Sequence, residues 1–234
     1  MDSNFRILSV VPSITELFFD LGLGKQVVGR TKFCVHPKGE VKKLPIVGGT
    51  KNLHIEKIRA LRPDLIIANK EENTKEDIEA LAKETEIWLT EISTLEENFK
   101  LIEDLSDRFG ISEVGRKIIE KTHATIHRMT LPEQKSALYL IWRNPYMSVG
   151  KDTFIHHMLK ATGYTNICAD LTRYPIVDLQ QFKQSPPDCV LLSSEPYPFR
   201  QKHIAEISRF FPESEIKLVN GEFFSWYGSR IANL

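Results

Sequence analysis

The sequence of 234 residues has few cysteines and no excess of charge of either sign. Its cysteines, Cys34, Cys168 and Cys189, lie far apart, and this spacing indicates neither a disulfide framework nor a Cys-x-x-Cys metal site. Lysine plus arginine and aspartate plus glutamate each number 31. Zero net charge argues against a general nucleic-acid-binding protein, which needs a surplus of cations. No apolar run approaches the ~20 residues of a membrane span, so we expect no membrane insertion.

The N-terminus lacks the features of a secretion signal. Residues Met1 to Asn4 lead directly into the apolar run Arg6–Val11, without a basic region, a long apolar segment or a small-residue cleavage site. We therefore expect a cytoplasmic protein, with a periplasmic location as the alternative if a leader has been removed.

Common catalytic and nucleotide-binding motifs are missing as well. Ser13 and Ser225 lack a G-x-S-x-G elbow, and Gly48–Lys51 lacks the P-loop spacing before its lysine. His123 and His127 are four residues apart, a spacing that can hold a divalent metal, but no third ligand is evident nearby. The sequence therefore predicts no catalytic residue and no metal ligand, and it favours a binding protein over an enzyme.

Strand and helix patterns alternate in the first third of the chain. Alternation of this kind predicts an α/β lobe with a parallel sheet. Ser13 is expected to cap the first helix, with Glu16 as its capping-box partner. The strands are predicted over Arg6–Val11, Val27–Gly29, Leu65–Ala68 and Ile87–Thr90, with helices from Ser13, over Leu53–Leu61 and from Thr74.

The middle of the chain is helical and its last third returns to alternation. Ser112–Met129 would form a helix of about 27 Å at ~1.5 Å per residue, separated by Gly110 from a helix beginning near Thr94. The last third predicts strands over Ala137–Trp142, Cys189–Ser193 and Ile216–Val219, and helices over Thr153–Thr162, Asp178–Gln184, Gln201–Phe211 and near Ser225. We expect an α/β fold of two Rossmann-like lobes with parallel sheets, joined by a single long backbone helix: lobe 1–93, helical segment 94–132 and lobe 133–234.

The two outer thirds also share a pattern at a constant offset of 124 residues. Pro63-Asp64, four apolar residues and Glu71 recur as Pro187-Asp188, four apolar residues and Glu195. Helical apolar pairs precede both copies in the same register. The repetition indicates a duplicated α/β unit.

Aromatic and charged residues gather in the loops that follow the predicted strands. Ligands of open parallel sheets bind beyond the carboxyl ends of the strands. Rings interleaved with charges suit a large, flat, partly polar ligand, here in a cleft between the lobes; the alternative is that single rings cover the sheet ends. The candidate ligand-binding residues in these loops are Asn69, Glu71, Trp142, Arg143, Tyr146, Glu195, Tyr197, Glu222, Trp226, Tyr227 and Arg230.

The opening segment Ile7–Glu16 resembles the first strand and helix of class III, or helical-backbone, substrate-binding proteins. These proteins serve uptake transporters for vitamin B12, iron-siderophores and haem. Leu61–Ile66, Trp142–Met147 and Ser148–Thr153 continue the resemblance. The chain is most similar to the vitamin B12 and iron-siderophore branch, and in particular to leaderless proteins described as cobalamin-binding proteins or helical backbone metal receptors. The family's fold of two lobes and one backbone helix agrees with the pattern above.

The resemblance also implies particular site residues. Ligand-facing aromatic positions of the B12-binding members fall at Phe33, Thr50, Asn69 and Tyr174, and Thr50 and Asn69 depart from the aromatic pattern. The family's acidic contact near the last loop falls at Glu222 and its arginine at Arg230. Glu56 matches one of two glutamates that dock on a transporter, whereas the second position falls near the uncharged Gln180.

The implied function is non-catalytic binding of a bulky metal chelate, which could be a corrinoid, a siderophore or a haem-like molecule. The protein would be the substrate-binding component of an ABC-type uptake system, with a permease as its partner and no intrinsic cofactor. The alternative is a cytosolic metallochaperone or enzyme that reuses the fold, in which Glu71, Glu195 and Arg143 would do acid–base or metal work.

Overall fold

The computed structural model describes residues 4–234. Residues 1–3, which begin the predicted lobe 1–93 and the N-terminal segment discussed above, lie outside the described residues. The chain divides into two compact units. Unit 1 contains the residues up to Ile92, Glu97–Thr122 and Tyr227–Asn233, and unit 2 contains Ser93–Glu96, His123–Trp226 and Leu234. The predicted groove between two lobes stays a prediction.

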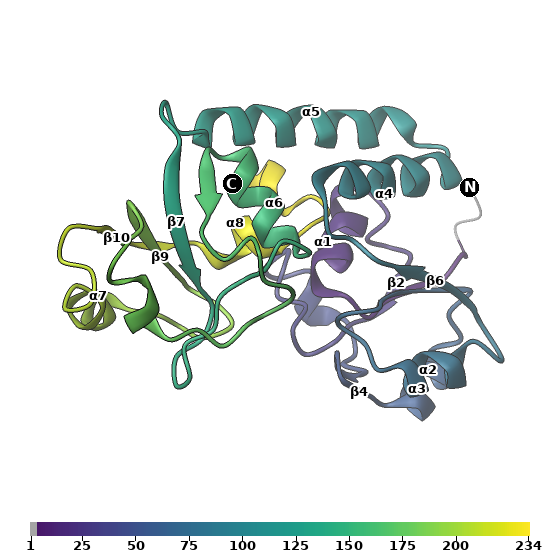
Figure 1. The fold of residues 1–234 in the computed structure, drawn as a ribbon. Coiled ribbons are helices and arrows are strands. Elements are labelled where there is room, and N and C mark those ends of the chain that lie inside the picture. Colours follow the sequence, from purple (N-terminus) through teal and green to yellow (C-terminus); the bar gives the residue numbers. More distant parts are fainter. Residues whose placement is uncertain (1–3) are drawn as a thin grey trace. The chain divides into compact units, whose positions relative to one another are not determined.

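Unit 1 is built on a four-stranded parallel sheet in the order β2-β1-β5-β6 (Figure 1). The central strands β1 and β5 are buried and mostly apolar on both faces, as expected for a parallel sheet covered by helices. The strands of this sheet are β1 (Ile7–Ser9), β2 (Val27–Gly29), β5 (Leu65–Asn69) and β6 (Glu86–Thr90). The helices and the antiparallel pair around it are α1 (Pro12–Asp20), η1 (Val41–Lys43), β3 (Gly48–Gly49), β4 (Asn52–Leu53), α2 (Ile55–Leu61), α3 (Lys75–Leu81) and η3 (Arg230–Asn233).

Unit 2 has a sheet of the same design, in the order β10-β9-β7-β8. Its strands are β7 (Lys135–Leu140), β8 (Tyr164–Asn166), β9 (Cys189–Ser193) and β10 (Glu215–Val219). Its helical elements are α6 (Phe154–Ala161), η2 (Leu179–Phe182), α7 (Gln201–Ile207) and α8 (Gly221–Ser225). The core on one face of the sheet combines Leu138, Leu140, Val190 and Leu192 with Phe211.

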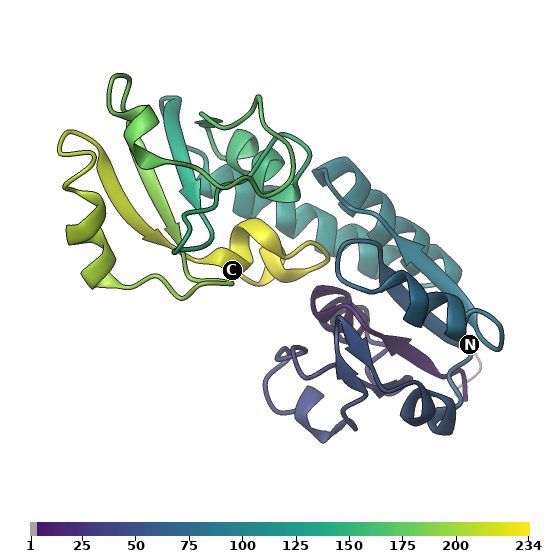
Figure 2. The same ribbon diagram turned by 60° about the horizontal axis from the view of Figure 1, so that its bottom comes forward.

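Two longer helices carry the chain from one unit to the other. They are α4 (Leu95–Arg108) and α5 (Ser112–Met129), and α5 has the predicted bounds. Within unit 1, α4 and the first half of α5 lie side by side in both ribbon views (Figures 1 and 2). Gly115 permits this approach, because a Cβ at that position would collide with the side chain of Ser106.

The duplicated pattern corresponds to a duplicated structure. β5 and β9 occupy the same place in their sheets and are offset by the residue spacing of the sequence repeat. Each repeated aspartate ties its strand to the neighbouring one. Asp64 Oδ2 accepts a hydrogen bond from Arg6 N at 2.8 Å, and Asp188 Oδ2 accepts one from Ser136 N at 2.7 Å. The Pro-Asp motif therefore fixes the start of the central strands in both units.

Several predicted elements are shorter in the structure, and some were missed. The predicted helix Asp178–Gln184 is the 3₁₀ turn η2, and the predicted helix Gln201–Phe211 ends at Ile207. The strand β8 and the β3-β4 pair were not predicted; both are too short for a pattern of alternating hydrophobicity to stand out.

Two further expectations differ at α1 and at the C-terminus. Ser13 does not cap α1, whose N-cap is Val11, because the helix already begins at Pro12, a residue suited to the first helical position. The residues Tyr227–Asn233, predicted as the end of the second lobe, cluster with unit 1. This segment belongs to unit 1 because Arg230 donates a hydrogen bond to Glu16 of α1.

Candidate functional site

An aromatic group lies at the carboxyl ends of β7 and β9 in unit 2. The rings of Trp142 and Tyr197 meet edge to face with centroids 5.8 Å apart, and Tyr197 packs in the same manner on Phe199 at 4.8 Å. A backbone hydrogen bond from Tyr197 N to Ile141 O joins the two loops. Trp142 remains 40% exposed. The two predicted residues Trp142 and Tyr197 therefore form one apolar surface at the edge where ligands bind in sheets of this kind.

Beside these rings, Arg143 and Tyr146 share one carboxylate. Arg143 Nε donates to both oxygens of Glu206, at 3.0 and 3.1 Å, and Tyr146 Oη donates to the same carboxylate. The hydrogen bond from Arg143 lowers the pKa of Glu206, which keeps it ionised at neutral pH. Burial, with the Glu206 carboxylate beside it, raises the pKa of Tyr146 to about 12, so the phenol stays protonated. Glu206 lies on α7 and was not predicted from the sequence.

Glu195 follows β9 and binds residues at the end of α8 in unit 2. Its Oε1 accepts hydrogen bonds from Ser225 Oγ at 2.7 Å and from Trp226 Nε1 at 2.9 Å. The turn that carries it is closed by Ser193, whose Oγ accepts a hydrogen bond from Glu195 N at 3.3 Å. The predicted residues Glu195 and Trp226 are therefore direct partners.

Unit 1 has an equivalent turn after β5. Asn69 Oδ1 accepts hydrogen bonds from Glu71 N at 2.8 Å and Glu72 N at 3.3 Å, and Asn69 Nδ2 donates to Thr90 Oγ1 at 3.2 Å. Asn69 is only 2% exposed. The structure thus uses the Asn69 amide to shape the turn that presents Glu71.

A buried asparagine organises the neighbouring loop of unit 1. Asn73 Nδ2 donates to the carbonyl oxygens of Thr50 at 3.0 Å and Val10 at 3.3 Å. Asn73 was not predicted, because it belongs to no sequence motif. Phe33, at 50% exposure, lies in the segment after β2, with Lys32 Nζ 4.9 Å from its ring centroid.

The last predicted residues lie in a different environment. Arg230 Nε donates to Glu16 Oε2 at 2.9 Å and its Nη2 donates to Glu16 Oε1, with exposures of 7% and 3%. Burial raises the pKa of Glu16 despite this hydrogen bond. Tyr227 Oη donates to Glu72 at 3.3 Å. These side chains hold the C-terminal segment on unit 1, and their expected contact with a ligand stays a prediction.

Three other predicted residues are at least partly exposed. Tyr174 is 37% exposed in unit 2, with the Arg173 guanidinium 5.7 Å from its ring centroid. Glu222 is half-buried in α8, and its N–H donates to the N-cap residue Asn220 at 3.1 Å. Glu56 lies on α2 with its side chain 82% exposed, paired with Arg59 at 2.5 Å.

The described residues contain neither a metal-binding cluster nor a helix suited to a membrane. Between residues 4 and 234, no three or more His, Cys, Asp or Glu side chains come together as a metal site would require. No helix in that same range combines the length and the apolar composition that crossing a bilayer demands.

Comparison with known proteins gives a consistent result. The periplasmic binding protein family matches residues 7–210. An uncharacterised ABC transporter substrate-binding lipoprotein of Bacillus subtilis (strain 168) is 28% identical over 199 residues, which are 80% of this chain and 62% of the relative. The chain thus spans less than two thirds of that protein. A vitamin B12-binding protein of Pectobacterium carotovorum subsp. carotovorum (strain PC1) is 25% identical over 237 residues, covering 97% of this chain and 84% of the relative.

A solved structure shows the same fold. The periplasmic haem-binding protein from Roseiflexus sp. RS-1 in apo form superposes with a TM-score of 0.81 at 21% identity, covering 97% of this chain and 94% of that one. The expected α/β class and the resemblance to class III substrate-binding proteins are confirmed.

The expected cytoplasmic location is wrong. The family is described as periplasmic, the Bacillus relative is a lipoprotein and the Roseiflexus protein is periplasmic. The expectation rested on the residues at which the sequence starts, and these do not decide the compartment. The family match extends over most of this chain, and the chain therefore belongs to the periplasmic binding protein family.

Proposed function

We propose that the chain binds a bulky metal chelate, of the corrinoid, haem or siderophore kind, and delivers it to the permease of an ABC-type uptake system. The names of the B12-binding and haem-binding relatives support this ligand class. The observation that carries the proposal is the exposed aromatic surface of unit 2, where Trp142 and Tyr197 meet at the carboxyl ends of β7 and β9. Flat rings of this kind bind a macrocycle or an aromatic chelate over a large area with little loss of conformational entropy.

Unit 1 supplies exposed apolar side chains of its own. Phe33, Val35 and Ile46 are all exposed and lie in the segment that links β2 to β3. We assign these side chains, with Thr50 and Glu71, to ligand contact. Asn69 then acts by shaping the turn rather than by touching the ligand, since its amide is buried and hydrogen-bonded.

Titration tests the proposal directly. The protein is mixed with cobinamide, cobalamin, haemin and a ferric siderophore, and absorbance and tryptophan fluorescence report binding. We expect a Kd well below 100 μM for at least one ligand. A Kd above ~100 μM for all four, corresponding to less than ~5.5 kcal/mol of binding free energy, would refute the proposal.

A pair of variants tests the aromatic surface. Trp142→Ala should weaken chelate binding by about tenfold, the loss expected when a stacked ring worth ~1.5 kcal/mol is removed. Leu218→Ala is the matched control, because Leu218 is also an exposed apolar residue of unit 2 but lies on the strand β10. Equal affinities of the two variants would remove Trp142 from the site.

We assign permease docking to the face of α2 that carries Glu56. Its side chain is highly exposed, and its partner Arg59 also pairs with Glu84 at 2.7 Å. In a reconstituted transporter, Glu56→Arg should abolish uptake while ligand affinity in solution is unchanged. Normal uptake by this variant would contradict the assignment.

A further inference from the structure

We infer that the ligand carries a carboxylate and that Arg143 binds it; this inference rests on the proposed function. The geometry of the guanidinium supports it. Arg143 uses only Nε to bind Glu206, whereas an arginine offers five N–H donors. Within the part of the chain that the structure describes, Arg143 forms no ion pair besides the one with Glu206, and the Tyr146 phenol is its other neighbour. We assign Nη1 and Nη2 to a carboxylate of the ligand.

The contacts with Glu206 orient the Arg143 guanidinium without a ligand. Glu206, on α7, is held by Arg143 and also by Tyr146, which lies three residues further along the same loop. The side chains of Arg143 and Glu206 are 30% and 31% exposed, so the ion pair remains partly accessible to solvent. A pre-positioned fork of this kind matches the two coplanar oxygens of a carboxylate.

Trp142, next to Arg143 in the sequence, indicates the shape of the rest of the ligand. Trp142 directly precedes Arg143 and presents an exposed ring packed against Tyr197. A ligand with a flat apolar body and a carboxylate at its rim would place the body on the ring and the carboxylate on Nη1 and Nη2. Neutral carboxamides can accept from the same donors, but their hydrogen bonds are about half as strong as charge-assisted ones.

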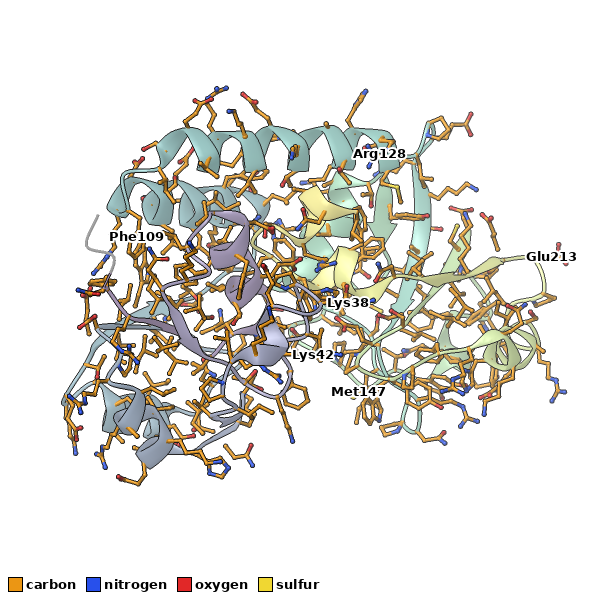
Figure 3. The ribbon with its side chains drawn as sticks, turned by 180° about the vertical axis from the view of Figure 1, so that it is seen from behind. Lys38, Lys42, Phe109, Arg128, Met147 and Glu213 are labelled. Carbon is orange, nitrogen blue, oxygen red and sulfur yellow. The ribbon has the colours of Figure 1, made fainter. Side chains whose placement is uncertain are left out.

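A separate feature of unit 1 favours a ligand of the same charge. Residues 30–43 contain the exposed lysines Lys32, Lys38, Lys42 and Lys43 and a single acidic residue, Glu40. Figure 3 labels Lys38 and Lys42 on this segment. Among residues 4–234, no carboxylate pairs with any of the four lysines. Unpaired cations raise the local concentration of anionic ligands and accelerate their association.

A pair of closely matched probes tests the inference on the unmodified protein. Haemin and haemin dimethyl ester have the same macrocycle and the same metal, but only haemin has free carboxylates. We expect the protein to bind haemin at least tenfold more tightly than the ester in the same buffer. Ferric citrate serves as a second carboxylate-rich chelate without a macrocycle.

Variants then assign the preference to one side chain. Arg143→Gln should lower the affinity for haemin by about tenfold and leave the affinity for the ester unchanged, so that the preference disappears. Arg209→Gln is the control, because Arg209 is an exposed arginine just after α7. If Arg143→Gln still preferred haemin over the ester, another residue would bind the carboxylate and the assignment to Arg143 would be wrong.

The outcomes separate this inference from the proposed function. Equal binding of haemin and its ester, or binding confined to cobinamide, cobalamin and hydroxamate chelates, overturns the carboxylate inference and leaves the proposed function standing. Failure to bind any of these chelates, ferric citrate included, refutes the proposed function as well.

Discussion

Removal of Arg230 provides the sharpest test of how the C-terminal segment is held. Arg230 and Glu16 are almost fully buried, and two hydrogen bonds join the guanidinium to the two carboxylate oxygens. Arg230→Met keeps most of the side-chain volume but leaves a buried carboxylate without its cation. Breaking a buried pair in this way costs about 3–5 kcal/mol. Asn233 Nδ2, 3.3 Å from Glu16 Oε1, is too distant and too weak a donor to replace the cation.

The cost should depend on pH, because the remaining carboxyl can take up a proton. Burial already raises the pKa of Glu16, and loss of Arg230 removes the interaction that opposes this rise. A carboxyl with a raised folded-state pKa binds more protons in the folded state, so the free energy of unfolding falls as pH rises from the unfolded value of 4.5 through the raised pKa. The variant should therefore lose more stability at pH 8 than at pH 5.

Urea unfolding monitored by circular dichroism at both pH values measures these effects. Arg116→Met is the control, since Arg116 also pairs with glutamates but is exposed on α5, and exposed pairs contribute little. The double variant Glu16→Gln with Arg230→Met should recover part of the loss and most of the pH dependence. A loss below ~1 kcal/mol in Arg230→Met, or a loss no larger than that of Arg116→Met, would refute the reasoning.

Three further predictions concern the repeat, the helix contact and the carboxylate shared in unit 2. Asp64→Ala and Asp188→Ala should lower the urea midpoint by similar amounts, since each removes one equivalent hydrogen bond. Hydrogen bonds from Ser136 lower the pKa of Asp188, so the stabilisation by Asp188 should be lost as pH falls below 3.8, the usual pKa of an aspartate. Gly115→Ala should cost about 1–3 kcal/mol in urea unfolding through its collision with α4, and adding Ser106→Gly should restore most of it; no rescue would mean that the clash lies elsewhere. Tyr146→Phe should lower haemin affinity severalfold in absorbance titrations without changing the urea midpoint, whereas unchanged affinity would show that the phenol does not help to orient Arg143.

The sequence predicted those parts of the fold whose signals are local. β9 and α5 have the predicted bounds, because a buried apolar run after Pro-Asp and a long 3.6-residue period each identify an element without help from the rest of the chain. β8 (Tyr164–Asn166) was missed because it is short and polar at its centre. Its position depends on pairing with β7, a contact that no local pattern reveals.

In the candidate site, too, residues with a local sequence signal were predicted and residues with distant partners were not. The loop residues Trp142 and Tyr197 were selected by the rule that ligands meet the carboxyl ends of parallel strands, and the structure places their rings in contact. Glu206 was not selected because it lies 63 residues from Arg143 within an ordinary helix pattern. Glu16 fitted a capping box in sequence, yet its partner is Arg230, 214 residues away. Residues defined by distant partners have no sequence signal of their own.

The two repeats share one turn and differ in another connection. The turns after β5 and β9 are alike, since a polar side chain at the strand end binds the N–H of Glu71 or Glu195. The connections after β1 and β7 are not alike. In unit 1 the chain passes from β1 directly into α1 through the fully buried residues Val10 and Val11.

In unit 2, residues 141–153 separate β7 from α6, and this longer loop carries Trp142, Arg143 and Tyr146. The sheets of the two units are alike, and the extended loop after β7 carries the ring and the guanidinium to which we assign the ligand. Shortening this loop to the direct connection seen after β1 should abolish chelate binding and leave the sheet of unit 2 folded, because all three side chains lie outside β7. Retention of ligand affinity by such a variant would place the binding surface elsewhere in the chain.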